Sequence, residues 1–249
     1  TLPQAKEISP YRYVGVNFNS QGNPNLKPSD HYNLDLKWDF NPTPTELISL
    51  TAFYKLIKNP ISRIEVASAG GYLSYENIAD KATVAGVEIE IRKNLFVRPV
   101  SNAAHGMNKL SLGLNGSYIY TNAKMPLATV TTGSQLEGAA PWIVNFDLSH
   151  NFTKGERSFV NTLVLNYVSD KIYTIGTQGY QDMMEQGVLT LDFVSQAKLN
   201  KHLSLNLKAR NLLNPSYKLS RKANENGEKV ILNDYKKGIN ISLGVSCTF

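Results

Sequence analysis

Cysteine and long apolar runs are scarce in this sequence. Cys247 is the single cysteine among 249 residues, so the chain cannot form an internal disulfide, and we interpret it as a small hydrophobic residue. No stretch approaches the roughly 18 consecutive apolar residues that a membrane-spanning helix requires. This excludes a helical membrane protein. It leaves a transmembrane β-barrel open, because barrel strands hide their apolar half by alternation.

Residue patterns that support catalysis or metal binding are also absent. The sequence has no CxxC or HExxH pattern, no phosphate-binding loop and no G-x-S-x-G motif, so it predicts neither a metal, a cofactor nor an enzyme. Glu88 and Glu90 fall on the same face of one strand, where we interpret them as wall residues rather than an acid–base pair. The histidines are too far apart for ligand spacing, at His31, His105, His150 and His202.

The charge balance gives no sign of nucleic-acid binding. The net charge is +6, and most basic residues are dispersed among acidic ones, whereas a nucleic-acid surface needs clustered lysine and arginine. The densest basic group lies between Lys218 and Lys237, in one late connection. We interpret this group as a solvated loop or a contact for membrane phosphates, and predict no nucleic-acid partner.

A period-two pattern recurs along the whole chain. Successive side chains of a strand point to opposite faces, and from Ile239 to Phe249 the odd positions are apolar while the even positions are polar or small. Helical spacing is hard to find, so the sequence predicts an all-β, antiparallel fold. The nine predicted strands cover approximately residues 32–40, 48–56, 85–91, 110–120, 142–152, 159–173, 189–198, 203–210 and 239–249.

The predicted connections alternate between short and long. Short turns are expected at residues 41–45, 153–156 and 200–201, and long links at about 59–71, 122–139, 176–187 and 215–237, with one intermediate link at 94–108. Tight turns at one rim and long loops at the other are typical of outer-membrane barrels. A soluble up-and-down barrel has less reason to keep its long loops on one rim.

Alternation alone does not decide which face points inward, because a soluble barrel buries its apolar face and a membrane barrel turns it to lipid. Three features favour the membrane barrel: strands of about ten to fifteen residues, aromatic residues near strand ends, and the apolar-face Phe249 at the chain end. Nine is an odd number of strands, and open edges cannot be satisfied in lipid. We therefore expect residues 1–249 to be the C-terminal part of one larger barrel domain. Residues 1–30 would form an external loop, and residues 31–249 the strands and loops.

Several motifs resemble segments of TonB-dependent outer-membrane receptors, and the tail is most similar to receptors of Bacteroides-type bacteria. They occur in the order found in the family and span most of the chain, which makes the set more specific than any one motif. The motifs lie at Asn23–Pro28 with Tyr32–Leu36, Tyr75–Ile78 with Val84–Ile91, Ala209–Tyr217, and Tyr235–Leu243 followed by Phe249.

The resemblance implies a barrel of about 22 strands filled by an N-terminal plug. It implies energy-dependent uptake of a scarce nutrient, such as a siderophore, a vitamin, a glycan or a peptide, in the outer membrane of a Gram-negative cell. Expected partners are the plug and remaining strands, the TonB complex, outer-membrane lipid and lipopolysaccharide, and the barrel-assembly machinery, which would read Phe249. In glycan-importing relatives a surface lipoprotein covers the receptor, and the sequence does not decide whether this chain has such a partner. Neither the plug nor the TonB-contacting box occurs in this chain.

Two residue sets are candidate sites. Charged residues on the polar face are expected to line the lumen and meet the plug: Asp35, Lys37, Asp39, Glu88, Glu90, Arg92, Asp147, Asp192, Lys208 and Arg210. Aromatic and cationic residues of the long loops are candidates for substrate contact: Tyr11, Arg12, Tyr13, Tyr72, Tyr75 and Tyr180. The competing functions are a passive porin or structural barrel and a soluble all-β carbohydrate-binding domain.

Overall fold

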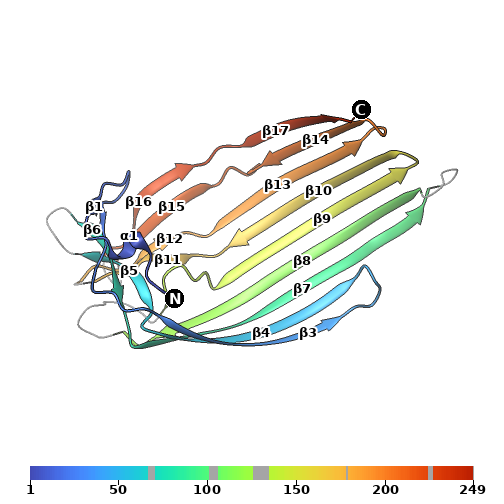
Figure 1. Ribbon diagram of the computed structural model, residues 1–249. Coiled ribbons are helices and arrows are strands. Elements are labelled where there is room, and N and C mark those ends of the chain that lie inside the picture. The colour runs from blue at the N-terminus through green and yellow to red at the C-terminus, as the bar shows by residue number, and fades with distance from the viewer. Residues whose placement is uncertain (67–70, 101–105, 126–134, 178, 224–226, 249) are drawn as a thin grey trace.

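One nine-stranded antiparallel sheet dominates the molecule (Figure 1). The computed structural model describes all residues except 67–70, 101–105, 126–134, 178, 224–226 and 249. The nine strands correspond to the nine that the alternation predicts, and each pairs with its neighbour in chain order. They are β3 (Asp30–Phe40), β4 (Leu47–Lys58), β7 (Lys81–Pro99), β8 (Met107–Ala123), β9 (Trp142–Lys154), β10 (Arg157–Val168), β13 (Val188–Lys198), β14 (Leu203–Arg210) and β17 (Asn240–Cys247).

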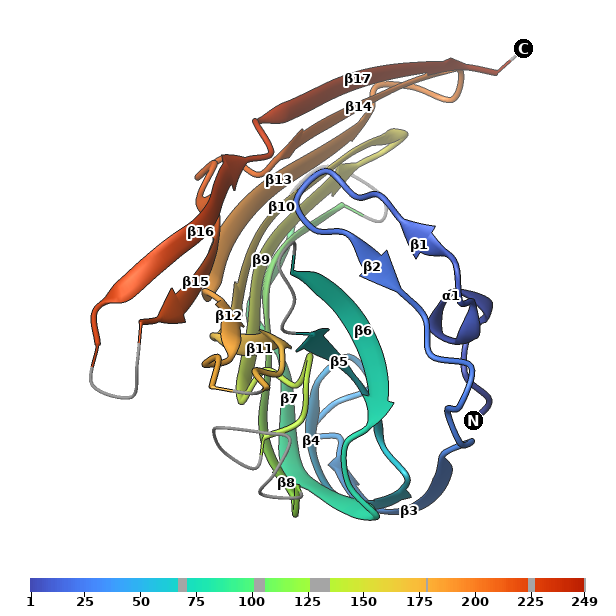
Figure 2. The same ribbon diagram turned by 90° about the vertical axis from the view of Figure 1, so that its left-hand side faces the viewer.

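The sheet curves into a trough (Figure 2). The all-β, antiparallel prediction is confirmed, but no closed barrel forms within the described residues. Strand β3 pairs only with β4, and β17 only with β14, so these two strands are the edges of the described sheet.

Long and short connections segregate to opposite ends of the trough, which we name the loop end and the turn end (Figure 1). Strands β7 and β8 extend further than predicted and approach each other as far as Pro99 and Met107, so the intermediate link becomes another short turn-end connection. The β9–β10 turn consists of Gly155 and Glu156. Gly155 has a φ of 60°, a conformation that glycine adopts readily.

The long connections contain secondary structure that the alternation does not predict. The strand expected to continue to Tyr173 ends at Val168, and a separate short strand follows it. No helix in the described part of the chain is long and apolar enough to span a membrane. The loop-end elements are α1 (Ala5–Ile8), β1 (Arg12–Tyr13), β2 (Ser20–Gln21), β5 (Ile61–Val66), β6 (Tyr72–Asn77), β11 (Lys171–Thr174), β12 (Met183–Glu185), β15 (Ser216–Lys222) and β16 (Lys229–Lys236).

The loop-end strands form two four-stranded sheets, ordered β1-β2-β6-β5 and β11-β12-β15-β16. A parallel bridge between Ile64 and Ile175 joins them. The main hydrophobic core lies at this junction rather than within the trough, and it consists of Ile64, Ile78, Ala79, Ala82, Ala123, Leu136, Ile172 and Ile175.

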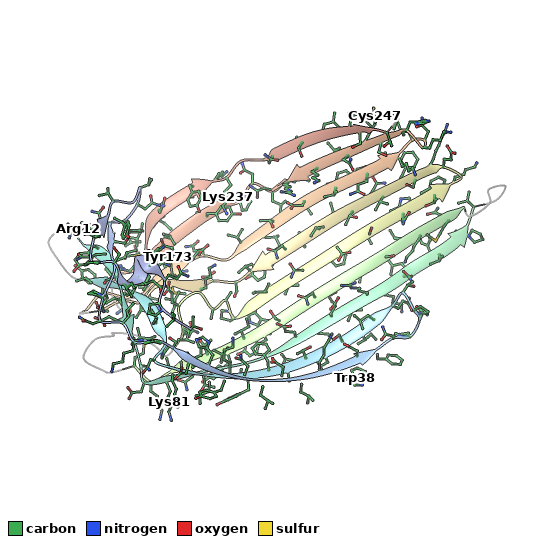
Figure 3. The ribbon with its side chains drawn as sticks, viewed as in Figure 1. Arg12, Trp38, Lys81, Tyr173, Lys237 and Cys247 are labelled. Carbon is green, nitrogen blue, oxygen red and sulfur yellow. The ribbon has the colours of Figure 1, made fainter. Side chains whose placement is uncertain are left out.

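On one face of the large sheet, in contrast, many apolar side chains are exposed. Leu36 retains 74% of its accessible surface and Leu243 retains 72%. Residues directly opposite each other on paired strands share a face, and the registers place these leucines on one continuous apolar face. A water-soluble protein rarely exposes so large an apolar surface. Figure 3 shows Trp38 of this face at the outer side of β3, pointing away from the trough.

Gly86 of β7 is required by close packing on the opposite, concave face. A Cβ atom at this position would lie 2.3 Å from Cζ of Phe53 and 2.5 Å from the backbone oxygen of Tyr118. We expect Gly86→Val to lower the free energy of unfolding by about 1–3 kcal/mol through overpacking. Gly116→Ala is the control, because its Cβ would meet only Cγ2 of Ile89, at 3.7 Å. Urea unfolding of the full receptor in lipid vesicles measures both, and equal stability of the two variants would contradict the packing argument.

Candidate functional site

The charged residues expected on the polar face do lie on one face of the sheet. The register places Asp39, Ser49 and Glu90 in one row, and Arg92 with Asp147 in the next, on either side of Gly113. When the strand pairings are followed as far as β14, all ten predicted charged residues fall on this same face of the sheet: Asp35, Lys37, Asp39, Glu88, Glu90, Arg92, Asp147, Asp192, Lys208 and Arg210. The sequence therefore predicts correctly which residues share this face.

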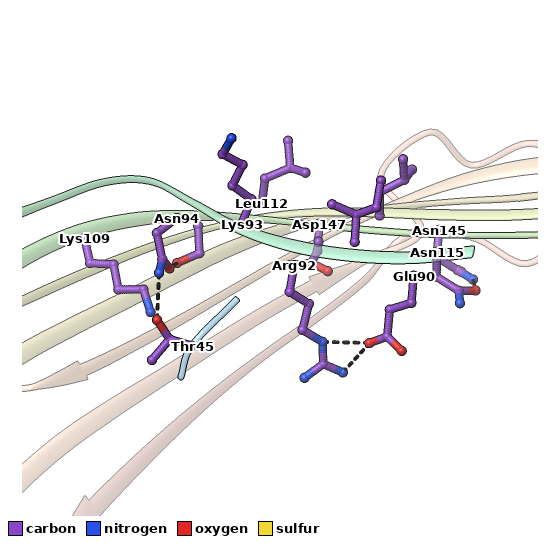
Figure 4. A pocket seen from close by; sticks show the side chains of 14 residues that line it. Thr45, Glu90, Arg92, Lys93, Asn94, Lys109, Leu112, Asn115, Asn145 and Asp147 are labelled. Atoms are coloured by element: carbon purple, nitrogen blue, oxygen red, sulfur yellow. Dashed lines mark hydrogen bonds and ion pairs between the residues drawn. The ribbon is translucent and has the colours of Figure 1, made fainter. Parts of the chain in front are cut away.

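Part of this face forms a hollow of about 490 Å³ (Figure 4). Arg92 pairs with the carboxylate of Glu90 at 2.7 Å. Asp147 lies over the backbone of Gly113, where a Cβ atom would be only 2.1 Å from its Oδ1. Figure 4 shows Arg92, Glu90 and Asp147 on one side of the sheet, with Lys93 and Leu112 on the other. The hollow thus combines mixed charges with open space.

An amide row crosses the same face and was missed at the sequence level. Asn145 donates to Asn115 at 3.4 Å and accepts a hydrogen bond from Asn166, so three neighbouring strands are linked by side chains. Each asparagine occupies a polar position of the alternation, which is the signal that could have identified the row. Amides offer both donors and acceptors, so the face can bind neutral polar groups as well as ions.

The loop-end assembly brings together most of the predicted aromatic candidates. Strand β1 pairs with β2, which pairs with β6, so Tyr11, Arg12 and Tyr13 lie in or beside the same small sheet as Tyr72 and Tyr75. The Arg12 guanidinium lies 5.2 Å from the centre of the Tyr72 ring.

Exposure separates these candidates. Tyr11 is 76% exposed, and Tyr13 and Tyr180 also present substantial surface, whereas Tyr75 is 8% exposed. The buried ring of Tyr75 does not offer the open face that ligand stacking requires, because it packs inside the loop-end sheet. Tyr180 comes from another connection, and its ring lies 5.2 Å from the Arg221 guanidinium.

Arg63 is the centre of a half-buried network that sequence reasoning missed. Its guanidinium pairs with Glu137 at 2.8 Å, donates to the backbone oxygen of Tyr173 and lies 4.0 Å from the Tyr173 ring centre. Burial raises the pKa of the Glu137 carboxyl above its ordinary value, and the hydrogen bonds and charge of Arg63 oppose that rise. A second ion pair joins Glu65 to Arg221. Both pairs bridge segments far apart in sequence, and no local pattern indicates such partners.

The described residues contain no group of three or more histidine, cysteine or acidic side chains arranged to hold a metal ion. Phe249, the predicted assembly signal, lies outside the described residues. Figure 3 places Arg12 and Tyr173 at the loop end, and Cys247 toward the turn end. The chemistry of the site is therefore that of a polar wall below an aromatic and cationic loop assembly.

Comparison with known protein families gives a match over most of the chain. The family model described as TonB dependent receptor-like, beta-barrel, matches residues 1–212. No curated protein and no solved structure match the chain.

Proposed function

Because the chain belongs to the TonB-dependent receptor-like β-barrel family, we propose that it forms the C-terminal barrel section of a receptor that imports a scarce nutrient. The family comprises outer-membrane receptors and transporters rather than enzymes. The observation that carries the proposal is the curved sheet with one exposed apolar face and one charged, hollowed face. A membrane barrel presents the first kind of face to lipid and the second to its lumen.

In this proposal the apolar face contacts the hydrocarbon of a Gram-negative outer membrane, and the loop end projects outside the cell. Further strands complete a barrel of about 22, and the plug of the full receptor occupies the lumen. Mixed charges such as Glu90, Arg92 and Asp147 then meet polar groups of the plug or of a passing nutrient.

The proposed partners follow from this placement. The plug would contact the TonB complex, and phospholipid and lipopolysaccharide would surround the barrel. Phe249 would be read by the barrel-assembly machinery, and a surface lipoprotein could cover the loop end. Nutrient contact is assigned to the exposed residues Tyr11, Arg12, Tyr13 and Tyr180 and to the partly exposed Tyr72. Ferric siderophores, vitamins, glycans and peptides are the candidate classes.

Energised uptake separates this function from that of a passive porin. The full receptor would be expressed in a strain lacking its own receptors, and uptake of labelled ferric siderophore, cobalamin, maltooligosaccharide and tripeptide would be measured. We expect receptor-dependent accumulation of one of these probes, abolished by a protonophore or by deletion of TonB. In planar bilayers, the plugged receptor should give little steady conductance.

Accumulation that persists without TonB, together with stepwise open-channel conductance, would identify a porin and overturn the proposal. The same uptake assay tests the loop residues. Tyr11→Ala with Tyr13→Ala should weaken uptake at limiting probe concentration by about tenfold, since each ring contributes about 0.5–1.5 kcal/mol by stacking. Tyr75→Phe, at a buried ring, is the control and should leave uptake unchanged.

A further inference from the structure

A stripe of polar side chains interrupts the apolar face near the turn end. His150, Asn161 and Ser195 occupy directly opposite positions on β9, β10 and β13. Asn108 of β8 and Arg98 of β7 lie on the same face, one row further toward the turn end, where Asn108 is directly opposite Arg98 on one side and Phe152 on the other. We name these five residues the polar stripe.

The His150, Asn161 and Ser195 part of the polar stripe lies between two rows that carry apolar side chains. On its loop-end side, Leu148 is opposite Leu112 and Leu163, and Leu163 is opposite Phe193. On the turn-end side, Phe152 and Phe159 continue the row of Arg98 and Asn108, and their rings lie 6.4 Å apart. Polar groups on a lipid-facing wall are costly and tend to mark functional positions, so this row requires an explanation.

Hydrogen bonds within the polar stripe satisfy only part of its capacity. The His150 ring lies 2.8 Å from Oδ1 of Asn108, and Ser195 donates to Oδ1 of Asn161 at 2.7 Å. In the described part of the chain, the amide nitrogen of Asn161 has no hydrogen-bond acceptor. The exposed Arg98 has no carboxylate partner there either, and its guanidinium lies 5.5 Å from the centre of the Phe96 ring. Unused donors therefore point outward.

The depth of the polar stripe matches a membrane boundary. The Trp142 ring contacts the Tyr118 ring in a tilted arrangement, with ring centres 4.6 Å apart, and marks the aromatic edge of the apolar face toward the loop end. Trp142 and His150 are eight positions apart on β9, which is about 27 Å along the strand at about 3.4 Å per residue. A strand tilt of about 40° reduces this to about 21 Å across the membrane, close to the apolar band of about 25 Å that barrels present.

The surroundings of the polar stripe are positively charged. Beyond it toward the turn end lie Lys154 and Arg157 beside the β9–β10 turn, and Lys198 and Lys201 beside the β13–β14 turn. Glu156 is the single acidic residue in these two turns and their flanking strand ends. Basic side chains at a membrane surface attract anionic headgroups.

We propose that the polar stripe binds the phosphate of an anionic phospholipid in the leaflet at the turn end. The Arg98 guanidinium and the Asn161 amide donate to the phosphate oxygens, and Phe152 and Phe159 flank the bound headgroup. This assignment rests on the proposed membrane function, because it requires the apolar face to contact lipid.

The test uses the full receptor reconstituted in nanodiscs of equal phosphatidylglycerol and phosphatidylcholine. Native mass spectrometry after mild detergent release measures which lipid stays bound. We expect the wild type to retain phosphatidylglycerol about tenfold more than phosphatidylcholine, and Arg98→Leu with Asn161→Leu to reduce this ratio to about one. Lys81→Leu is the matched control, because Lys81 lies on the same strand and face as Arg98 but at the loop end, and its ratio should stay at about ten.

Both stripe replacements place leucine on the lipid face, which favours insertion, and heat-modifiable mobility checks folding. An absent preference in the wild type, an unchanged ratio in the double variant, or an equal loss in the Lys81 control would overturn the proposal. Failure of the import function is distinguishable, because loss of energised uptake with an intact lipid ratio rejects only that function.

Discussion

Replacing Leu165 with arginine is expected to lower the free energy of unfolding in lipid by about 2–4 kcal/mol, the cost of a lipid-facing cation at the midplane. Leu165 lies on the apolar face opposite Phe146 and Leu191. This row is midway between the Trp142 row and the His150 row, so the arginine cannot readily reach either membrane surface. Urea unfolding of the full receptor in vesicles measures the loss.

The adjacent residue provides the control. Val164 lies on the polar face, directly opposite Asp147 on one side and Asp192 on the other. An arginine at this position gains two acidic neighbours in a hydrated space, so Val164→Arg should change stability by less than about 1 kcal/mol. If Val164→Arg proved the more damaging of the two, the faces would be reversed and the membrane placement would be wrong.

The second large effect is expected at the loop end, from Arg63→Met. Arg63 and Glu137 retain only 23% and 20% of their side-chain accessible surface. Removing the guanidinium leaves the half-buried Glu137 carboxylate without its cationic partner, with only the backbone N–H of residue 63 still donating to it. It also removes a donor to the Tyr173 backbone oxygen. We expect the local free energy of opening to fall by about 2–3 kcal/mol, somewhat less than the 3–5 kcal/mol typical of a fully buried pair.

This loss should grow with pH. Burial already raises the pKa of Glu137 above its ordinary value of 4.5, so the folded state holds the proton more tightly than the unfolded state. The stabilisation that the protonated Glu137 carboxyl gives the folded state is therefore fully present below pH 4.5, and it is lost as the pH rises through the folded-state pKa of Glu137. The Arg63 side chain normally limits the rise in the folded-state pKa of Glu137. In the variant this pKa is higher, so stability continues to fall up to a higher pH than in the wild type.

Hydrogen exchange of two backbone amides at the junction measures this opening, after correction for the pH dependence of intrinsic exchange rates. The Glu65 amide donates to the backbone oxygen of Ile175, and the Ile175 amide donates to the backbone oxygen of Arg63. Lys218→Met is the control, because the Lys218–Asp234 pair is exposed and 3.6 Å long and should contribute less than about 1 kcal/mol. A similar loss of protection in both variants, or a deficit independent of pH, would contradict the assigned role of the Arg63 pair.

The nine sheet strands could be predicted from sequence because their physics is local. Each strand separates an apolar face from a polar face, and the resulting alternation is legible even in one sequence. For example, Ile89 and Ile91 alternate with Glu88 and Glu90, and the registers place them on opposite faces as expected. The same rule correctly groups the ten charged residues of the polar face.

The loop end could not be predicted because its strands are short and do not separate an apolar from a polar face. In β5, Ser62 and Ile64 are both buried while Arg63 lies between them, so burial does not follow hydrophobicity. Its stabilising contacts join distant segments, such as Arg63 to Glu137 and Glu65 to Arg221. The burial of Tyr75, a predicted candidate for substrate contact, is not visible in the sequence for the same reason, since it depends on a sheet assembled from three separate stretches.

The exposed backbone of β17 constrains any strand that docks beside it. In the described sheet β17 pairs only with β14, so its other side offers a fixed sequence of donors and acceptors. A shift of one residue in the register of the docking strand would exchange its inward-facing and outward-facing side chains. A docking strand must therefore align its apolar residues with Ile241, Leu243 and Val245. The edge of β17 thus acts as a template that selects one register.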